Sequence, residues 1–386
     1  KYAFYGCEAL NEVNLESVKT IDNWAFAHTG LGETEISNVT ERIGDSAFLN
    51  SSATLFIEFA QRPTAWNSTW NASDCTAVWN YADNRGVTAD GIRWAETAGD
   101  CAVIYGYEGR GGKVTLPESV SYEDRTLKVT EIANYGFTAP AVTELTVPQG
   151  IVRIGRGAFS SCSQLKILNI PYLGESLGLS EASEKSLLGY IFGTREYDGG
   201  VETIQDYADG ENVTYYIPSA LTTVKVEGGE VYFGAFSDCK NLIEIVLPEA
   251  LTAIPERLFD GCSALKTIEI PRGVTTVGSF AFRNCGIESI TVPAAVLSIG
   301  TEAFLGCEEL IRVDITDLES WINIRFSGGT ANPLYYAGNL YVNGEILTDL
   351  IVPENIFSLG GWTFVNAVCL KSVTLHENIA GVDREA

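Results

Sequence analysis

Apolar and polar residues alternate in short runs along this chain, and the same pattern returns at a regular interval. The stretch from residue 265 to residue 310, LKTIEIPRGVTTVGSFAFRNCGIESITVPAAVLSIGTEAFLGCEEL, contains it twice. Each copy has an LxxIxIP-like segment, a VxxIG-like segment, and an Ala-Phe pair with a Cys three residues after the Phe. An interval of 22 or 23 residues is typical of stacked repeats rather than of a domain around one core.

Each copy predicts two short strands and a turn. Ile268 and Ile270 alternate with polar residues, so we expect their side chains to point inward, and Pro271 to end the strand because it has no N–H. Residues 274–278 predict a second extended piece on the opposite wall, and the segment around Phe282 predicts a short helical turn. One coil cannot bury these side chains alone. Coils stacked about 4.7–4.9 Å apart would place each Phe over the next.

The motif Phe recurs along most of the chain, at Phe4, Phe26, Phe48, Phe137, Phe159, Phe236, Phe259, Phe282, Phe304 and Phe364. The theme LxxIxIPxxVxxIGxxAFxxCxxL resembles the bacterial-surface-protein-A-like (BspA-like) leucine-rich repeats. This resemblance implies a right-handed, α/β horseshoe-like solenoid of mostly short strands and short helical turns. It also implies a secreted or surface-anchored protein, since members are implicated in adhesion to host matrix proteins or to other cells.

The repeats predict two consecutive arrays. We expect residues 1–85 to be the C-terminal part of a first array, closed by a Trp-rich cap at 60–81. Residues 86–386 would form a second array, which opens with a hairpin cap at 86–129 that has two strands around Ala98-Gly99-Asp100. Both caps are implied by the resemblance. Caps cover the apolar end that a solenoid would otherwise expose to water.

Two insertions interrupt the second array, at about 172–216 and 314–352, where the spacing between motif Phe residues rises to 77 and 60. The first contains a helix-permissive segment at 181–188, followed by an acidic, Gly-rich loop. The second contains Asn343-Gly344, a strong signal for a two-residue hairpin turn. Insertions in repeat proteins project from one side, which is often the binding side.

The net charge of −25 disfavours nucleic acid and anionic lipid as partners, whereas basic proteins and cations remain compatible with it. The acidic residues could also serve only to keep a long solenoid soluble. The sequence has no apolar run of the roughly 18 residues that a transmembrane helix needs. Because the chain begins and ends inside repeats, we expect it to be a piece of a longer protein, with any signal or anchor outside it.

Six of the nine cysteines lie three residues after a motif Phe, namely Cys7, Cys162, Cys239, Cys262, Cys285 and Cys307. Stacked side chains lie parallel at about 4.8 Å, whereas a disulfide needs Cβ atoms about 3.8 Å apart, so we expect buried thiols. Zinc is not expected, since no CxxC or CxxH pair occurs. Asp198, Asp206, Asp209 and Glu211 leave calcium open, although their spacing does not fit an EF-hand and a solvated acidic loop is the simpler interpretation.

Catalysis has little support in the sequence. His28 and His376 are the two histidines, and neither lies near a nucleophile motif such as GxSxG. The many carboxylates leave a glycoside hydrolase formally open, but a solenoid with a nearly flat face offers no obvious cleft. We therefore expect a protein that is not an enzyme and that has no cofactor.

The outward strand positions, such as Glu33, Glu35, Glu244, Thr267 and Thr291, would share one open, mostly small or acidic surface. Tight interfaces use Trp, Tyr and Arg, so aromatic residues of the cap and insertions are the better candidates for partner contacts. These candidates are Trp66, Trp70, Tyr190, Tyr197, Trp321, Tyr335, Tyr336 and Tyr341.

The sequence thus predicts a non-catalytic module on the cell surface or secreted, which binds an extracellular-matrix or cell-surface protein. A structural stalk that presents another domain is one alternative. A carbohydrate-binding protein is another, because Trp66, Trp70 and Trp79 could stack on sugar rings if they were exposed. The simpler interpretation of these tryptophans is a large apolar lid on the first array.

Overall fold

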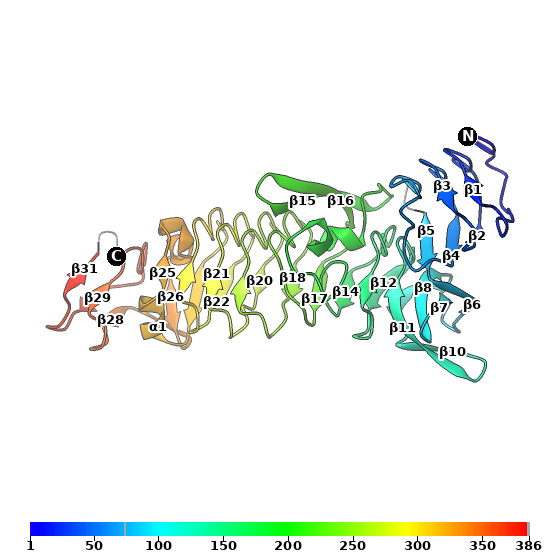
Figure 1. Ribbon diagram of the computed structural model, residues 1–386. Coiled ribbons are helices and arrows are strands. Elements are labelled where there is room, and N and C mark those ends of the chain that lie inside the picture. Colours follow the sequence, from blue (N-terminus) through cyan, green and yellow to red (C-terminus); the bar gives the residue numbers. More distant parts are fainter. Residues whose placement is uncertain (73–74, 384–386) are drawn as a thin grey trace. The chain divides into compact units, whose positions relative to one another are not determined.

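The computed structural model describes residues 1–72 and 75–383, which form short strands joined by turns (Figure 1). The chain folds as two units, Lys1–Ser163 with Ile191–Asp198 and Gln164–Tyr190 with Gly199–Ala386. The division into these units differs from the array boundary that the sequence predicts at residue 85. The predicted boundary concerns where one series of repeats ends and the next begins, and it stays a prediction. In each unit, successive coils place parallel strands side by side, so that the architecture is a β-solenoid with few helices.

In the first unit, the coils up to residue 79 form two walls. One wall is a parallel sheet in the order β2 (Glu33–Ile36), β4 (Thr54–Ile57) and β5 (Thr76–Trp79). The other pairs β1 (Thr20–Ile21) with β3 (Arg42–Ile43), also in parallel. Ile36 lies opposite Ile57, so the inward positions of neighbouring coils coincide.

A mixed sheet follows in the same unit. Its strands are ordered β10 (Ser119–Tyr122), β11 (Arg125–Ile132), β8 (Cys101–Tyr107), β7 (Ile92–Thr97) and β6 (Tyr81–Val87). β13 (Arg153–Ile154) pairs with β11, and β9 (Gly112–Thr115) pairs with β12 (Val142–Thr146). The hairpin predicted around Ala98-Gly99-Asp100 is confirmed, since β7 and β8 are antiparallel and Gly99 and Asp100 both have positive φ.

The second unit repeats the two-walled arrangement over more coils. One wall carries β14 (Ile167–Ile170), β17 (Thr223–Val226), β18 (Glu244–Val246) and β20 (Thr267–Ile268), and then a separate sheet of β22 (Ser289–Val292), β24 (Arg312–Ile315), β26 (Leu340–Val342) and β27 (Glu345–Ile346). The other wall carries β19 (Ala253–Ile254), β21 (Thr276–Val277), β23 (Ser298–Ile299) and β25 (Arg325–Phe326). Near the C-terminal end, β28 (Asp349–Ile351) pairs with β30 (Ser372–Thr374), and β29 (Ser358–Leu359) with β31 (Gly381–Val382).

The insertions form their own small elements. The first contains the 3-10 turns η1 (Glu184–Ser186) and η2 (Leu188–Ile191) and the hairpin of β15 (Gly200–Ala208) and β16 (Glu211–Pro218). The helix-permissive segment at 181–188 is therefore a short 3-10 turn rather than an α-helix. The second contains α1 (Leu318–Ile322), η3 (Gly329–Ala331) and α2 (Leu334–Ala337). The predicted hairpin is confirmed, since β26 and β27 pair across Asn343 and Gly344, with φ of 51° and 84°.

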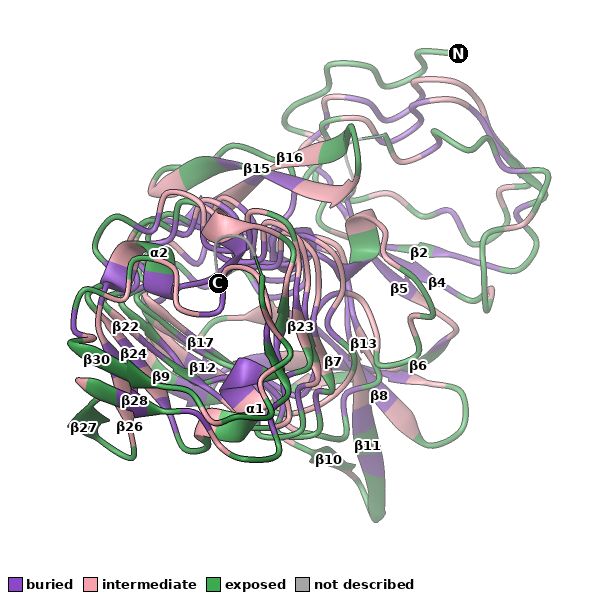
Figure 2. Ribbon diagram, turned by 90° about the vertical axis from the view of Figure 1, so that its left-hand side faces the viewer, coloured by how far each residue is buried: buried purple, intermediate pink, exposed green. Residues whose placement is uncertain are grey.

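A column of stacked rings fills the interior. Phe236, Phe259, Phe282 and Phe304 follow one another with centroids 5.8, 5.3 and 5.0 Å apart, and all four are fully buried. Phe4, in the first coil, is 43% exposed, whereas Phe26 in the next coil is 4% exposed. Burial of each ring thus depends on the coils on both sides. In Figure 2, strands between two coils contain buried residues, whereas β30 in the last coil is exposed.

The motif turns are not helical, so the prediction of short helical turns was wrong at these positions. The N–H of Phe282 donates to the carbonyl oxygen of Ala303 in the next coil at 2.8 Å, instead of bonding within its own turn. The N–H groups of Phe280 and Asn284 likewise donate to the next coil, and both residues have left-handed φ, of 58° and 56°. Alternate residues of the turn thus build a third hydrogen-bonded wall. This use of the N–H donors excludes a helix.

Five of the six motif thiols are buried, as the sequence predicted, but Cys7 in the first coil is exposed, so its predicted burial was wrong; no disulfide links the nine cysteines. The Cys262 Sγ donates to the carbonyl oxygen of Phe236 at 3.1 Å, and the Cys285 Sγ to that of Phe259 at 3.0 Å. The Cys307 Sγ repeats the contact with Phe282 at 3.0 Å. Each thiol thereby satisfies a carbonyl oxygen of the preceding coil. Burial raises the pKa of Cys307 to about 12.

Truncation of a ring inside the column should destabilise the fold more than truncation at its end. We expect Phe282→Ala to lower the free energy of unfolding by about 3–5 kcal/mol, because it leaves a cavity between two coils. Phe4→Ala is the matched control, and its half-exposed ring should cost much less. Urea unfolding followed by circular dichroism measures both, and equal losses would contradict the dependence on two-sided stacking.

The thiol ladder predicts a loss of stability at alkaline pH. Burial raises the folded-state pKa of Cys285, so its stabilising contribution is present below the unfolded-state pKa of about 8.5. Above this pH the thiol is deprotonated in the unfolded chain but not in the folded one. The free energy of unfolding therefore falls by up to about 1.4 kcal/mol per pH unit for each thiol. We expect Cys285→Ala to flatten the fall of the urea midpoint between about pH 8.5 and 10.5. The exposed Cys7 provides the control, since Cys7→Ala should leave the slope unchanged; equal slopes in both variants would refute the ladder's role.

Candidate functional site

The outward side chains of the second unit's strand wall lie in register, as predicted. Glu244 lies opposite Thr267 in β18 and β20, and Ser289 lies opposite Arg312 in β22 and β24. Parallel pairing brings these positions into rows along the wall. The rows are exposed or half-exposed and carry mainly hydroxyl and carboxylate groups.

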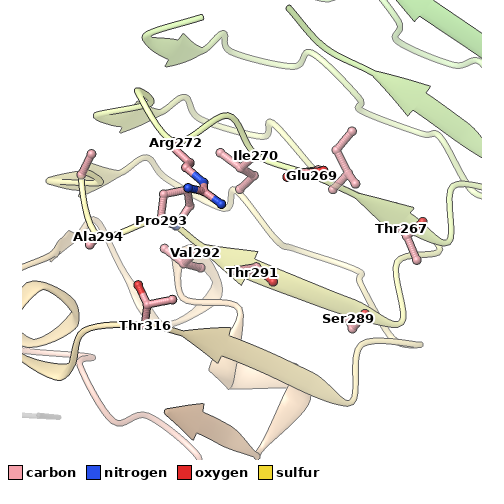
Figure 3. A pocket seen from close by; sticks show the side chains of 12 residues that line it. Thr267, Glu269, Ile270, Arg272, Ser289, Thr291, Val292, Pro293, Ala294 and Thr316 are labelled. Atoms are coloured by element: carbon pink, nitrogen blue, oxygen red, sulfur yellow. The ribbon is translucent and has the colours of Figure 1, made fainter. Parts of the chain in front are cut away.

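A groove of about 700 Å³ opens on this wall where the two sheets meet. The ladder of β18 and β20 ends at Ile268, and β22 starts a new sheet at Ser289. The polar lining comes from Thr267, Glu269, Arg272, Ser289, Thr291 and Thr316. Figure 3 shows the Arg272 side chain close to Ile270 and Pro293, with Thr267, Ser289 and Thr291 farther along the strands. The interrupted ladder thus produces the groove.

The charged groups of the groove are not paired with each other. Among the residues that the structure describes, neither Glu269 nor Arg272 takes part in an ion pair, and both are exposed. Arg312, two coils farther on, is in contrast bound to Asp314 through two hydrogen bonds of 2.6 and 2.7 Å. Its guanidinium also lies 3.8 Å from the ring centroid of Tyr341. Arg272 is therefore the guanidinium of this wall that is available to a partner.

The hairpin of β15 and β16 lies along the neighbouring coils (Figure 1). A buried glutamine, Gln205, fastens it to them. Gln205 Oε1 accepts from the N–H of Gly189 at 2.6 Å, and Nε2 donates to the carbonyl oxygens of Ala235 and Ser237 at 3.2 and 3.1 Å. On the opposite face of the same strand, Ile204 is exposed. One face of the hairpin is thus held and the other presented to solvent.

Acidic residues of the first insertion meet arginines of the neighbouring coils. Arg257 lies 3.7 Å from Asp206 and 3.2 Å from Asp260, and Arg283 pairs with Asp260. Burial raises the pKa of Asp206 above its ordinary value. Within residues 1–72 and 75–383, no group of three or more Asp, Glu, His or Cys is arranged to hold a metal ion.

The aromatic candidates divide by burial. Trp66 and Trp70 are buried and pack edge-on with centroids 5.3 Å apart, each also contacting Trp79. Tyr190 is buried with its hydroxyl on Glu175, and the buried Trp321 donates from Nε1 to the carbonyl oxygen of Thr363. These side chains present no surface to a partner in this structure.

The remaining candidates are accessible. Tyr335 is exposed, and Tyr197, Tyr336 and Tyr341 are half-buried. Tyr335 and Tyr336 contact each other edge-on at 5.1 Å, and the Tyr336 hydroxyl accepts from the N–H of Gly306. A role in binding for these four tyrosines stays a prediction.

Glu33 and Glu35 point outward, as predicted, and Glu35 is exposed, but the outward face of the first unit's strands is only partly open because both carboxylates pair with arginines of the mixed sheet. Glu33 pairs with Arg93, and the Arg85 Nη1 lies 2.9 Å from Glu35. The outward Phe56 is fully buried under the rings of Tyr81 and Tyr105, which belong to the mixed sheet. The mixed sheet therefore takes the place that a partner would need.

Sequence reasoning missed a group of aromatic residues in the first two coils. Tyr2, Tyr5 and Trp24 contact one another and His28 contacts Tyr5, with ring centroids between 5.2 and 6.2 Å apart. Tyr2 and Tyr5 are 55% and 47% exposed. The signal was present in the sequence, since Tyr2 and Trp24 both stand two residues before a motif Phe.

The family model for the BspA-type leucine-rich repeat region matches this chain in six copies, over residues 1–69, 118–208 and 229–329. The chain belongs to the BspA-type leucine-rich repeat family. The motif that defines the family is the one whose Phe and Cys side chains stack in the interior. No curated protein is significantly similar to the chain in sequence.

Several solved structures resemble it. A leucine-rich repeat protein from Bacteroides ovatus ATCC 8483 is 20% identical, with 79% of each chain covered and a TM-score of 0.33. One from Eubacterium ventriosum ATCC 27560 is 20% identical, with 74% of this chain and 73% of that chain covered and a TM-score of 0.41. A leucine-rich cell surface protein from Faecalibacterium prausnitzii A2-165 is 16% identical, with coverage of 76% and 94% and a TM-score of 0.31. No helix among the described residues has the length and apolar character to cross a membrane.

Removal of the glutamine that fastens the hairpin should loosen β15 and β16. In Gln205→Ala, the N–H of Gly189 and the carbonyl oxygen of Ser237 lose a partner, at a cost of about 1–3 kcal/mol for each group, whereas the carbonyl oxygen of Ala235 keeps the N–H of Leu188. We expect faster amide hydrogen exchange in the hairpin, measured by mass spectrometry. Ile204→Ala, on the exposed face of the same strand, should leave exchange unchanged. Unaltered protection in Gln205→Ala would show that other contacts hold the hairpin.

Proposed function

We propose that this chain is a non-catalytic adhesion module, secreted or on the cell surface, that binds an extracellular-matrix or cell-surface protein. The observation that carries the proposal is the groove between β20 and β22, because it combines hydroxyl groups with a guanidinium that has no ion pair among the described residues. An extended protein segment suits such a groove, since its main-chain groups can bond to the hydroxyls.

The partner's charge follows from Arg272. A net charge of −25 repels acidic proteins at long range, so association should favour a partner with basic surroundings. Within the groove, however, one partner carboxylate can form a charge-assisted hydrogen bond with the guanidinium of Arg272. We therefore infer that the bound segment of the partner carries an acidic residue and that the partner's surface around this segment is neutral or basic.

The accessible tyrosines of the second insertion provide a second contact region. Tyr335, with Tyr336 beside it, and Tyr341 beside Arg312 are aromatic groups of the kind that dominate binding energy at interfaces. Tyr197, in the first insertion, belongs to the other unit and is a separate candidate. Family membership supports this function, because BspA-like repeats are associated with surface proteins.

The organisation that goes with this function is a right-handed solenoid of two arrays, residues 1–85 and 86–386. The Trp-rich segment at 60–81 would cap the first array, and its buried tryptophans Trp66 and Trp70 agree with a lid. That burial removes the support for sugar binding at this cluster. The hairpin segment at 86–129 would open the second array.

A binding screen with matched arginine variants tests the proposal. The folded chain is immobilised and exposed to matrix proteins and to whole cells at physiological salt. We expect saturable binding to a protein, weakened about tenfold, or by about 1.4 kcal/mol, in Arg272→Ala. Arg325→Ala, which removes an exposed arginine from β25 on the other wall, should bind like the parent chain.

Tyr335→Ala tests the second contact region in the same assay, and we expect a comparable loss. If no protein binds a well-folded sample, the chain is a stalk rather than an adhesion module. If Arg272→Ala and Arg325→Ala bind alike, the groove is not the contact surface.

A further inference from the structure

The first unit contains a strand with one open edge. β9 is the last strand of its sheet, and among the described strands it pairs with β12 alone. The N–H groups of Gly112 and Leu116 donate toward β12, in bonds of 2.8 and 2.9 Å. Because alternate residues of a parallel strand bond to opposite sides, the N–H and C=O groups of Lys113 and Thr115 point away from β12. Within the described part of the chain, nothing bonds to these four groups.

A cleft of about 650 Å³ lies along this open edge. Its lining comes from residues 113–115 of β9 and from two turns that adjoin the mixed sheet, at residues 87–91 and 107–111. All of β12 is described, and none of it lines the cleft. The cleft therefore lies on the side of β9 that faces away from β12. Edge strands of native sheets are usually covered or protected from pairing, whereas here space remains beside the unpaired backbone groups.

The two turns that border the cleft are fixed against each other. The N–H of Glu108 donates to the carbonyl oxygen of Gly91 at 2.8 Å. Gly109 lies so close to the other turn that a Cβ atom there would be 2.4 Å from the carbonyl oxygen of Asp90. The border of the cleft is thus formed before a ligand enters, which lowers the entropic cost of binding.

The charges around the cleft favour a basic ligand. Asp90 and Glu108 are exposed, and neither takes part in an ion pair among the described residues. The ammonium group of Lys113 is held by Glu144 of β12 at 2.6 Å, which leaves Arg110 as the other cation of the lining. Two carboxylates thus face one guanidinium, in a chain whose net charge is −25.

We propose that the open edge of β9 binds an extended, basic segment of a partner protein, which adds to the sheet as a further strand. The N–H and C=O groups of Lys113 and Thr115 bond to the main chain of the segment, as in other complexes formed by strand addition. A lysine or arginine of the segment pairs with Asp90 or Glu108, and an apolar side chain packs on the exposed Val87. The groove between β20 and β22 belongs to the other unit and shares no residue with this site.

The experiment uses the full chain and fluorescein-labelled decapeptides in which valine or threonine alternates with lysine, glutamate or serine. Fluorescence anisotropy at physiological salt measures binding. We expect saturable binding of the lysine peptide and weaker binding of the glutamate peptide. Methylation of single peptide N–H groups should weaken binding at every second position, because alternate N–H groups of an added strand face β9.

Variants of the chain test the same contacts. Thr115→Pro should weaken binding of the lysine peptide by about tenfold or more, since proline removes an edge donor that makes no bond to β12. Thr115→Val is the matched control, because it keeps the N–H and should bind normally. Asp90→Asn combined with Glu108→Gln should reduce the preference for the lysine peptide over the glutamate peptide. Arg272→Ala, in the groove, should leave peptide binding unchanged.

Circular dichroism verifies the fold of each variant. If Thr115→Pro disturbs the fold, the methylation series decides, since it needs no change in the chain. Absence of binding by every peptide, or a methylation series without a period of two, would overturn the proposal. Equal affinities for well-folded Thr115→Pro and Thr115→Val would also overturn it, and an unchanged preference in the double carboxylate variant would overturn the assignment of a basic segment.

Discussion

Hydrogen bonding between successive coils is the constraint on which the rest of this structure depends. Strand residues pair with the same positions of the next coil, and alternate N–H groups of the motif turns donate in the same direction. Because every coil is tied to its neighbours, successive motif rings lie with centroids 5.0 to 6.2 Å apart, within the contact range of aromatic pairs. A coil without a neighbour loses both kinds of contact, as the exposed Phe4 shows.

The same constraint explains how the chain tolerates long insertions. A coil must be in register with its neighbours only in the segments that form the walls. Extra residues can therefore be inserted between these segments without changing how the walls pair. The insertion with β15 and β16 does so and is then held by Gln205, whose three hydrogen bonds end on backbone groups of the coils. Where registry between neighbours weakens, as between β20 and β22, the wall opens into a groove.

Side-chain chemistry varies at the turn position two residues before each motif Phe, while the backbone there keeps a left-handed φ. Arginines cover the ring of Phe280, and another covers that of Tyr135. At Trp24 the neighbouring side chains are instead aromatic. Since each of these positions belongs to a different coil, a substitution in one coil changes the surface locally and leaves the scaffold intact.

The sequence by itself determined the repeat interval, the inward positions, the buried thiols and the hairpin at Asn343-Gly344, because these depend on local spacing and on contacts that every coil repeats. It misled at the motif turns, where the apparent helix is excluded by N–H groups that bond to the next coil. Only the tertiary structure decided which outward residues are accessible. Phe56 is covered by the mixed sheet, which also supplies the arginine that pairs with Glu33, and Trp66 and Trp70 turn inward. The groove also arises from particular neighbouring coils, and a local pattern contains no information about which neighbours meet.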